Sequence, residues 1–226
     1  HNAIPREGFA TIAIPTAKIK EFNAFVAKFT EILKSEWISK EPNINFFAEE
    51  TAAPARVMTD EFQNRLVKSF YTVAHGVLRM SPDIKGLVQS STNFAIVETR
   101  ENEVYCLTSQ RSSVETEKIN VANKVKTAFE LGGAKVEMGD GYPAWQPNVN
   151  SPILKVAGEV YKNMYGKEAH IEIIHAGLEC GLIGEKYPHM DMLSFGPNLR
   201  DVHSPDEKVQ ISSVERCYEF LKEVLK

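Results

Sequence analysis

The chain has 226 residues, of which 43% are apolar and 25% charged, and its 26 Lys and Arg against 30 Asp and Glu give a net charge of −4. This length suits one large domain or two small ones, and the composition excludes disorder as the default state. A weakly acidic chain is a poor candidate for binding nucleic-acid phosphates, and no uncharged stretch approaches the roughly 20 apolar residues of a membrane helix.

The cysteine count bears on the cellular compartment, and the first residue bears on whether the sequence is a piece of a longer one. Three cysteines cannot form a disulfide framework, and an odd number favours a reducing compartment. No secretory leader is visible, so we expect a cytoplasmic protein. The chain begins at His1 and its first residues read as the middle of a sequence, so we expect a piece of a longer protein.

Strand and helix signals alternate over the first part of the chain. Residues 9–14 (FATIAI) predict a strand that ends at Pro15, and Thr16 is placed to cap a helix after it. A second helix is expected to start at Thr59, with acidic residues at the positive end of its dipole. The apolar face of the first helix has spacings of three and four residues: Ile19, Phe22, Val26, Phe29 and Leu33.

The next elements form a predicted hairpin and a third helix. Residues 93–99 and 103–109 read as strands joined by a short loop, and a helix is predicted over 114–131, ended by two glycines. Residues 134–138 predict a last strand. With one helix taken as an insertion, this order corresponds to a ferredoxin-like layout.

A change in composition marks the best domain boundary. Residues 139–150 (GDGYPAWQPNVN) lack periodicity, so we divide the chain into residues 1–143 and 144–226. The second part predicts a helix from Ser151 and Pro152, strands at 169–175 and 190–195, and a C-terminal helix. The predicted class is thus an α+β domain followed by an α/β segment. Because α/β sheets usually hold five or six strands, we expect the others from elsewhere; a small edge sheet is the alternative.

His203 is the first candidate for chemistry. It lies in the loop 196–209 (GPNLRDVHSPDEKV), which follows a predicted strand, where open α/β sheets bind ligands. A zinc ligand oriented by a nearby carboxylate is one interpretation, and an exposed Ser-Pro-Asp-Glu turn is the other. The residues alone favour the turn, because a zinc site needs three or four protein ligands and no standard ligand motif occurs.

The stretch HAGLECG, residues 175–181, is the second candidate. A turn at Gly177 followed by a short helix could present backbone N–H groups to a substrate carboxylate; a plain strand–helix turn is the alternative. His175 and Glu179 could exchange protons, and Cys180 could be a nucleophile. No third group that would orient a Cys–His pair is evident.

Two further polar residues stand near predicted strands or turns. Arg111 follows a predicted strand, and its guanidinium could bind a carboxylate through two hydrogen bonds. Asn2 can donate or accept a hydrogen bond. Taken as isolated residues, both are expected to have surface roles.

Several long blocks, taken together, resemble one family. HNAIPREGFA, GYPAWQPNVNSP, IIHAGLECGL, MDMLSFGP and HSPDE occur in this order and are similar to the aminoacyl-histidine dipeptidases. These are cytosolic Xaa-His dipeptidases, related to carnosinases within the wider di-zinc aminopeptidase and carboxypeptidase group. The resemblance covers essentially the whole chain.

The resemblance implies a catalytic α/β domain with two bridged zinc ions and an inserted lid that forms the homodimer. Residues 1–143 would be most of a ferredoxin-like lid, and residues 144–226 the C-terminal part of the catalytic domain. His203 is carried over as a zinc ligand, and Asn2, Arg111 and Gly177 as substrate-binding residues. The substrate would be a carnosine-like Xaa-His dipeptide, hydrolysed by a metal-bridged water.

Much of the family's catalytic machinery has no counterpart here. The other zinc ligands and the general-base glutamate lie in its N-terminal part, in an H-x-D motif and a pair of adjacent glutamates. The chain's one H-x-D sequence, His189-Met190-Asp191, lies in its C-terminal part and not in the family's N-terminal part, and its one Glu-Glu pair, Glu49 and Glu50, lies in the lid segment. One His cannot hold two zinc ions, so we expect this chain to be inactive alone. A non-catalytic dimerisation module and a thiol hydrolase using Cys180 are the competing hypotheses.

Overall fold

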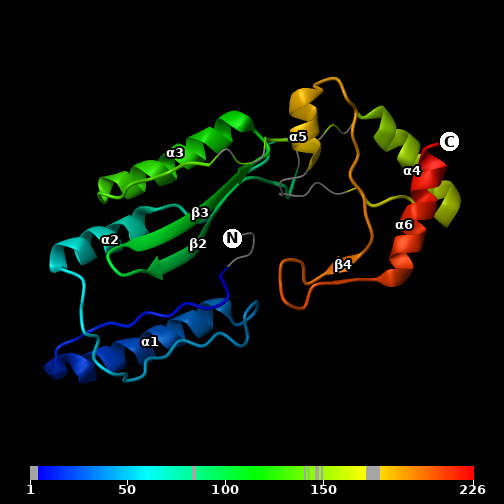
Figure 1. The fold of residues 1–226 in the computed structure, drawn as a ribbon. Helices are drawn as coiled ribbons and strands as arrows, with labels where there is room; N and C mark the ends of the chain where they lie inside the picture. Colours follow the sequence, from blue (N-terminus) through cyan, green and yellow to red (C-terminus); the bar gives the residue numbers. More distant parts are fainter. Residues whose placement is uncertain are drawn as a thin grey trace. The chain divides into compact units, whose positions relative to one another are not determined.

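The computed structural model describes residues 5–82, 85–139, 141, 143–145, 148, 150–171 and 179–226 (Figure 1). Contacts between residues group the chain into two compact units, Glu7–Asn64 and a larger unit that contains Arg65–Lys226. In the described ranges, no helix combines the length and the apolar character that crossing a membrane requires. The predicted boundary between residues 143 and 144 remains a prediction.

The smaller unit is built on one long helix. After a 3-10 turn at Thr16–Lys18, α1 spans Ile19–Trp37, as its apolar spacing predicts. Val26 is buried on this helix, and Phe29 meets the returning chain at Phe46, with ring centroids 5.3 Å apart. Thr30 Oγ1 also donates to the Phe46 carbonyl at 2.7 Å. The following loop therefore covers part of the apolar face of α1.

Two expectations for the start of this unit are wrong. Residues 9–14 are not a strand, because they pair with no neighbour in the described chain. Thr16 does not cap α1: it is the first residue of the 3-10 turn, and neither that turn nor α1 has a side-chain cap.

A three-stranded antiparallel sheet lies at the centre of the larger unit. Its strands β1 (Gly76–Met80), β2 (Val88–Thr99) and β3 (Val104–Ser112) follow in the order β1-β2-β3. The predicted hairpin is confirmed and is longer than expected, whereas β1 was not predicted. Pairing shifts by one residue between Phe94 and Ile96, which leaves Ala95 as a β-bulge.

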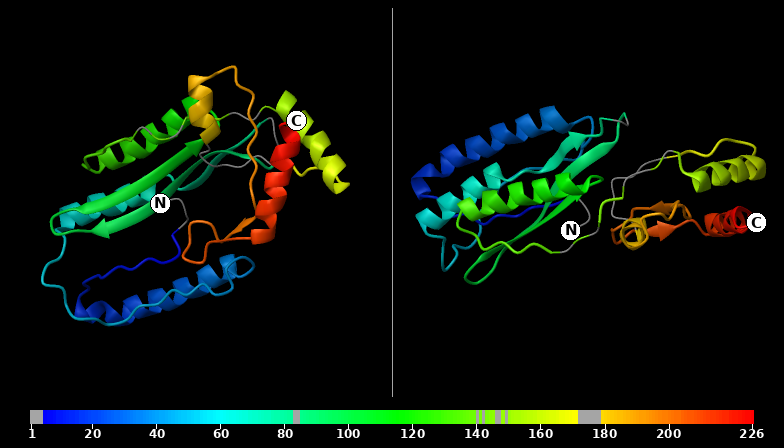
Figure 2. Two further views of the ribbon diagram at one scale, coloured as in Figure 1. Left: turned by 45° about the vertical axis from the view of Figure 1, so that its right-hand side comes forward. Right: turned by 90° about the horizontal axis from the view of Figure 1, so that it is seen from above.

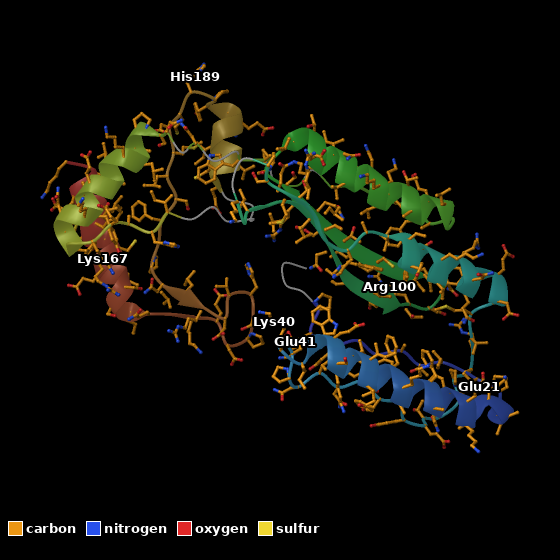
Figure 3. The ribbon with its side chains drawn as sticks, turned by 180° about the vertical axis from the view of Figure 1, so that it is seen from behind. Glu21, Lys40, Glu41, Arg100, Lys167 and His189 are labelled. Atoms are coloured by element: carbon orange, nitrogen blue, oxygen red, sulfur yellow. The ribbon has the colours of Figure 1, made fainter. Side chains whose placement is uncertain are left out.

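Arg100 closes the tip of this hairpin (Figure 3). Its amide donates to the carbonyl of Glu103 at 2.9 Å, and its guanidinium contacts the carboxylates of Glu98 and Glu103, each at 3.1 Å. The guanidinium carbon also lies 4.0 Å from the ring centroid of Tyr105. The short loop that the sequence predicts is thus held by one side chain.

Helices α2 (Asp60–Thr72) and α3 (Glu115–Leu131) cover one face of the sheet (Figure 1). Both helices are predicted from the sequence, and Thr59 Oγ1 accepts from the Phe62 amide at the start of α2. The core beneath them holds the buried Val73, Val125 and Phe129. Phe94 of β2 stands between both helices, with its ring edge-on to Phe70 and Phe129.

The chain after α3 differs from the prediction. Val136 packs against the core, but residues 134–138 are not a strand because they join no ladder in the described chain. The described elements therefore form a mixed α/β fold with small antiparallel sheets. The ferredoxin-like lid remains a prediction.

Five elements make up the described remainder of the chain: α4 (Pro152–Tyr165), α5 (Glu179–Lys186), β4 (Leu199–Arg200), β5 (Lys208–Val209) and α6 (Ile211–Val224). The predicted start of α4 is confirmed, since Ser151 Oγ accepts from the Leu154 amide at 3.1 Å and Pro152 is the first helical residue. Helices α4 and α6 lie side by side (Figure 2). Phe220 of α6 stacks edge-on against Tyr161 and Phe195.

The two strands predicted for this part have different outcomes. Residues 172–175 of the first lie outside the described chain, and residues 169–171 are not in a strand. Residues 190–195 are extended but pair with nothing in the described ranges, so that strand prediction is wrong for this chain. The ladder that is present here, β4 with β5, is antiparallel and two residues long.

Candidate functional site

His203 lies on a tight loop closed by β4 and β5. Leu199 pairs with Val209 and Arg200 with Lys208, so residues 201–207 form the loop between the two short strands. The loop holds itself through local hydrogen bonds. Ser204 Oγ donates to the Asp201 carbonyl at 2.7 Å and accepts from the Asp206 amide at 3.1 Å. The predicted turn chemistry is therefore present, and it gives the loop a defined backbone path.

The backbone of His203 adopts a rare conformation. Its φ of 66° is in the left-handed region, as is the φ of 54° at Asp201. The His203 amide donates to Glu207 Oε2 at 2.7 Å, which helps to hold this conformation. A left-handed non-glycine residue costs on the order of 1 kcal/mol or more, and such costs gather at functional sites. The imidazole is exposed, so this conformation does not serve to fill a core.

Whether zinc suits this loop depends on the side chains near His203 that could act as metal ligands. A neutral imidazole is a common zinc ligand, and an exposed one on an ordered loop suits one of the four positions. In the ranges that the structure describes, no three His, Cys, Asp or Glu side chains gather as a possible metal site. His203 therefore fits as a single ligand, and the other ligands must come from other residues.

Arg111 lies on a rigid part of the sheet. It is on β3, directly opposite Ser91 of β2, and its side chain is half-buried. On the other face of the same strand end, Ser90 Oγ and Ser112 Oγ are 2.9 Å apart, and Ser90 is fully buried. Ser112 Oγ also accepts from the Val114 amide at 3.1 Å. These bonds fix the register at Arg111, so its guanidinium projects from a fixed backbone position.

The second candidate stretch is described only in part. Asn2, His175 and Gly177 lie outside the described residues, whereas Glu179 and Cys180 are the first two residues of α5. Burial raises the pKa of the Cys180 thiol, and the charge of Glu179 raises it further. A nucleophilic cysteine needs a lowered pKa, so this environment disfavours the thiol-hydrolase hypothesis.

Sequence reasoning missed three polar side chains that shape this region. Asp191 Oδ2 accepts from the Ile153 amide at 2.8 Å, and Glu115 Oε2 accepts from the Ala144 amide at 3.1 Å. His75 Nδ1 accepts from the Phe94 amide at 3.0 Å. Each partner is 19 to 38 residues away, so no local pattern could have indicated it. His189, also without a predicted role, lies in the turn after α5 (Figure 3).

A cavity of about 500 Å³ lies beside α5. Glu115, Cys180 and Asp191 are among its polar lining residues, and Trp145 and Met192 supply apolar surface. The cavity thus joins the start of α3, residues 143–145 and the segment after α5.

The sequence of this chain matches a known peptidase family and a member of it. A family model described as peptidase family M20/M25/M40 matches residues 17–226. The chain belongs to this peptidase family. The cytosol non-specific dipeptidase of Escherichia coli (strain K12) is 39% identical over 227 residues, which cover 100% of this chain and 46% of that protein.

One solved structure agrees with this membership of the peptidase family, and another shares the fold. The crystal structure of aminoacylhistidine dipeptidase from Vibrio alginolyticus matches with a TM-score of 0.79 at 36% identity, covering 94% of this chain and 43% of that one. Aminopeptidase PepT from Bacillus cereus ATCC 10987 shares the fold, with a TM-score of 0.51 at 18% identity over 73% of this chain and 45% of that one. The resemblance to aminoacyl-histidine dipeptidases is confirmed, and the chain spans less than half the length of these relatives.

Proposed function

We propose that this chain is the C-terminal portion of a zinc-dependent dipeptidase that hydrolyses Xaa-His dipeptides. The observation that carries the proposal is His203, an exposed imidazole held with φ 66° on an ordered loop in a chain of the M20/M25/M40 peptidase family. A solved relative at 36% identity is named an aminoacylhistidine dipeptidase, which supports this substrate class.

The proposed roles divide between the two parts of the chain. His203 would hold zinc, and Arg111, Asn2 and Gly177 would bind the substrate, with the guanidinium suited to a carboxylate. Zinc, when bound, supplies a Lewis acid for the scissile carbonyl and an activated water. The H-x-D sequence at residues 189–191 and the Glu-Glu pair at residues 49–50 lie outside the N-terminal positions that the resemblance implies for the other zinc ligands and the general base, so we expect the chain to need the rest of a longer protein for turnover.

The central experiment compares two exposed histidines in a full-length enzyme that contains this chain. His203→Ala should lower bound zinc and abolish release of histidine from an Xaa-His dipeptide, because a ligand is lost. His189→Ala is the matched control, since His189 is also exposed on a turn and should keep both properties. Unchanged zinc content in His203→Ala would refute the ligand role.

The inactivity of the chain alone is tested separately. With added zinc, the 226-residue chain should release no histidine, whereas the full-length enzyme should. Robust turnover by the chain would refute its role as a part of the site. A full-length protein that folds, dimerises and hydrolyses nothing would instead support the non-catalytic module.

We also propose a cytoplasmic homodimer formed through the lid. Its support is β1, an edge strand among the residues that the structure describes, where Val77, Leu78 and Met80 expose apolar surface. The name of the E. coli relative, a cytosol dipeptidase, supports the compartment. Light scattering after size exclusion should give twice the chain mass, and Leu78→Lys should shift it toward the monomer.

A further inference from the structure

Residues 143–145 are held on one side by the first residue of α3. Glu115 Oε2 accepts from the Ala144 amide at 3.1 Å, and Glu115 Oε1 pairs with Lys118 Nζ at 2.8 Å. Both oxygens of one carboxylate are therefore engaged, one by this connecting segment and one by its own helix.

The same segment is pressed against α5 on its other side. A Cβ added at Gly181 would lie 2.6 Å from the Pro143 carbonyl oxygen, closer than real Cβ atoms approach other groups. Gly181 is buried, and the Cβ of Trp145 is also nearby, at 3.8 Å from the added atom. The backbone of residue 143 thus occupies the space that any side chain at residue 181 would need.

We propose that these contacts form a linker clamp, made of Glu115, Pro143, Ala144 and Gly181, which positions the two substrate-binding parts of the chain. Glu115 follows Arg111 by four residues along the chain, and α5 begins two residues after Gly177. The clamp therefore ties the strand end that carries Arg111 to helix α5, which begins two residues after Gly177 in the sequence. This inference rests on the proposed function, because it assigns Glu115 and Gly181 as positioning residues for that substrate.

The charge of Glu115 suits this task. Burial acts to raise the pKa of Glu115, but the hydrogen bonds from Lys118 and the Ala144 amide outweigh it and lower the pKa. The carboxylate is therefore ionised at neutral pH, and a charged acceptor gives the stronger hydrogen bond to an amide. Its place in the first turn of α3 adds a favourable interaction with the helix dipole.

Amide hydrogen exchange on the 226-residue chain tests the clamp without any activity. Glu115→Ala should speed exchange of the Ala144 amide roughly three- to tenfold, the loss expected for one hydrogen bond. Glu115→Gln keeps an acceptor oxygen and should restore most of the protection. Unchanged exchange in Glu115→Ala would overturn the clamp.

Two glycines of α5 supply a matched pair. Gly181→Ala forces Pro143 away and should also speed exchange at residues 144 and 145, although alanine is the better helix former. At Gly184 the added Cβ would meet Met192 Cε at 3.0 Å, the end of a flexible side chain, so Gly184→Ala should leave exchange unchanged. Equal effects of the two substitutions would overturn the role of the close approach.

Kinetics of the full-length enzyme then test the positioning role. Glu115→Ala and Gly181→Ala should raise KM for an Xaa-His dipeptide roughly three- to tenfold, with zinc content unchanged and a smaller effect on kcat. Gly184→Ala should match the wild type. Faster exchange with KM within about twofold of wild type would overturn positioning. A full-length protein without dipeptidase activity would refute the proposed function instead, and the exchange comparison would then decide the clamp by itself.

Discussion

Replacing Phe94 by leucine tests how the three-stranded sheet is joined to helices α2 and α3. The Phe94 ring lies 5.1 Å from that of Phe70 and 5.7 Å from that of Phe129, at interplanar angles of 78° and 82°. Leucine keeps most of the apolar volume but loses both edge-to-face contacts. Phe94 is three residues from Ser91, the partner of Arg111, so the substitution also probes the support of the candidate site.

The expected loss follows from these two ring pairs. Each edge-to-face pair contributes about 0.5–1.5 kcal/mol beyond its buried area, so the two together give about 1–3 kcal/mol. Phe25→Leu is the control, because Phe25 makes one ring contact, at 5.8 Å to Phe29, and is 58% exposed. Its loss should stay below about 1 kcal/mol.

Urea unfolding followed by circular dichroism measures both variants. Phe94→Leu should lower the midpoint with an unchanged slope, which reports a change in stability rather than in the denatured state. A loss below about 0.5 kcal/mol, or one no larger than that of Phe25→Leu, would refute the view that Phe94 joins the sheet to both helices.

Two further predictions concern single polar side chains. The hydrogen bond from the Ile153 amide, with those from Ser151 and the Met192 amide, lowers the pKa of Asp191. A lowered folded pKa stabilises the chain above the unfolded value of about 3.9 and loses this effect as pH falls through the folded value. Asp191→Asn should therefore lower the urea midpoint at pH 7, and the difference from wild type should vanish at the most acidic pH; a constant difference would contradict this. Arg111→Lys in the full-length enzyme should raise KM at least tenfold with zinc unchanged, because lysine cannot bind a carboxylate through two parallel bonds; loss of zinc would contradict the substrate-binding role.

Helices were predictable where their signals are local. The start of α4 at Ser151 and Pro152 depends on residues within its first turn, and the structure confirms it. The apolar faces of α1 and α3 likewise depend only on spacing along the chain. Thr16 failed as a cap because it is the first residue of a 3-10 turn ahead of α1, a choice that propensity does not decide.

Strands were less predictable because a strand exists only with a partner. Residues 9–14, 134–138 and 190–195 have strand-like compositions, yet none joins a ladder in the part of the chain that the structure describes. The reverse error is β1, whose GVLRM sequence is too short to stand out and depends on pairing with β2. In each case the pairing strand decides whether a strand forms, and that pairing lies outside the local sequence pattern.

In the candidate site, too, local features could be predicted and features set by remote residues could not. The turn residues around His203 could be recognised from the sequence. The left-handed φ of His203 could not, because it depends on the whole loop, including the hydrogen bond from the His203 amide to Glu207. Glu115 and Asp191 could not be found, because each acts on a backbone amide 29 or 38 residues away.

The bulge at Ala95 has a consequence for how this hairpin can vary among related sequences. Before it, Phe94 pairs with Thr108, and beyond it Ile96 pairs with Leu107, so the inside–outside alternation of β2 changes at one residue while that of β3 does not. An insertion or deletion at the tip, next to Arg100, leaves both faces as they are. Loss of Ala95 would remove the bulge and also leave both halves of β2 facing as they do, because Phe94 and Ile96 already pair with the adjacent residues Thr108 and Leu107. Length changes in this hairpin are therefore expected at the tip or at residue 95, whereas a single residue added elsewhere within a strand would turn the side chains beyond it to the opposite face.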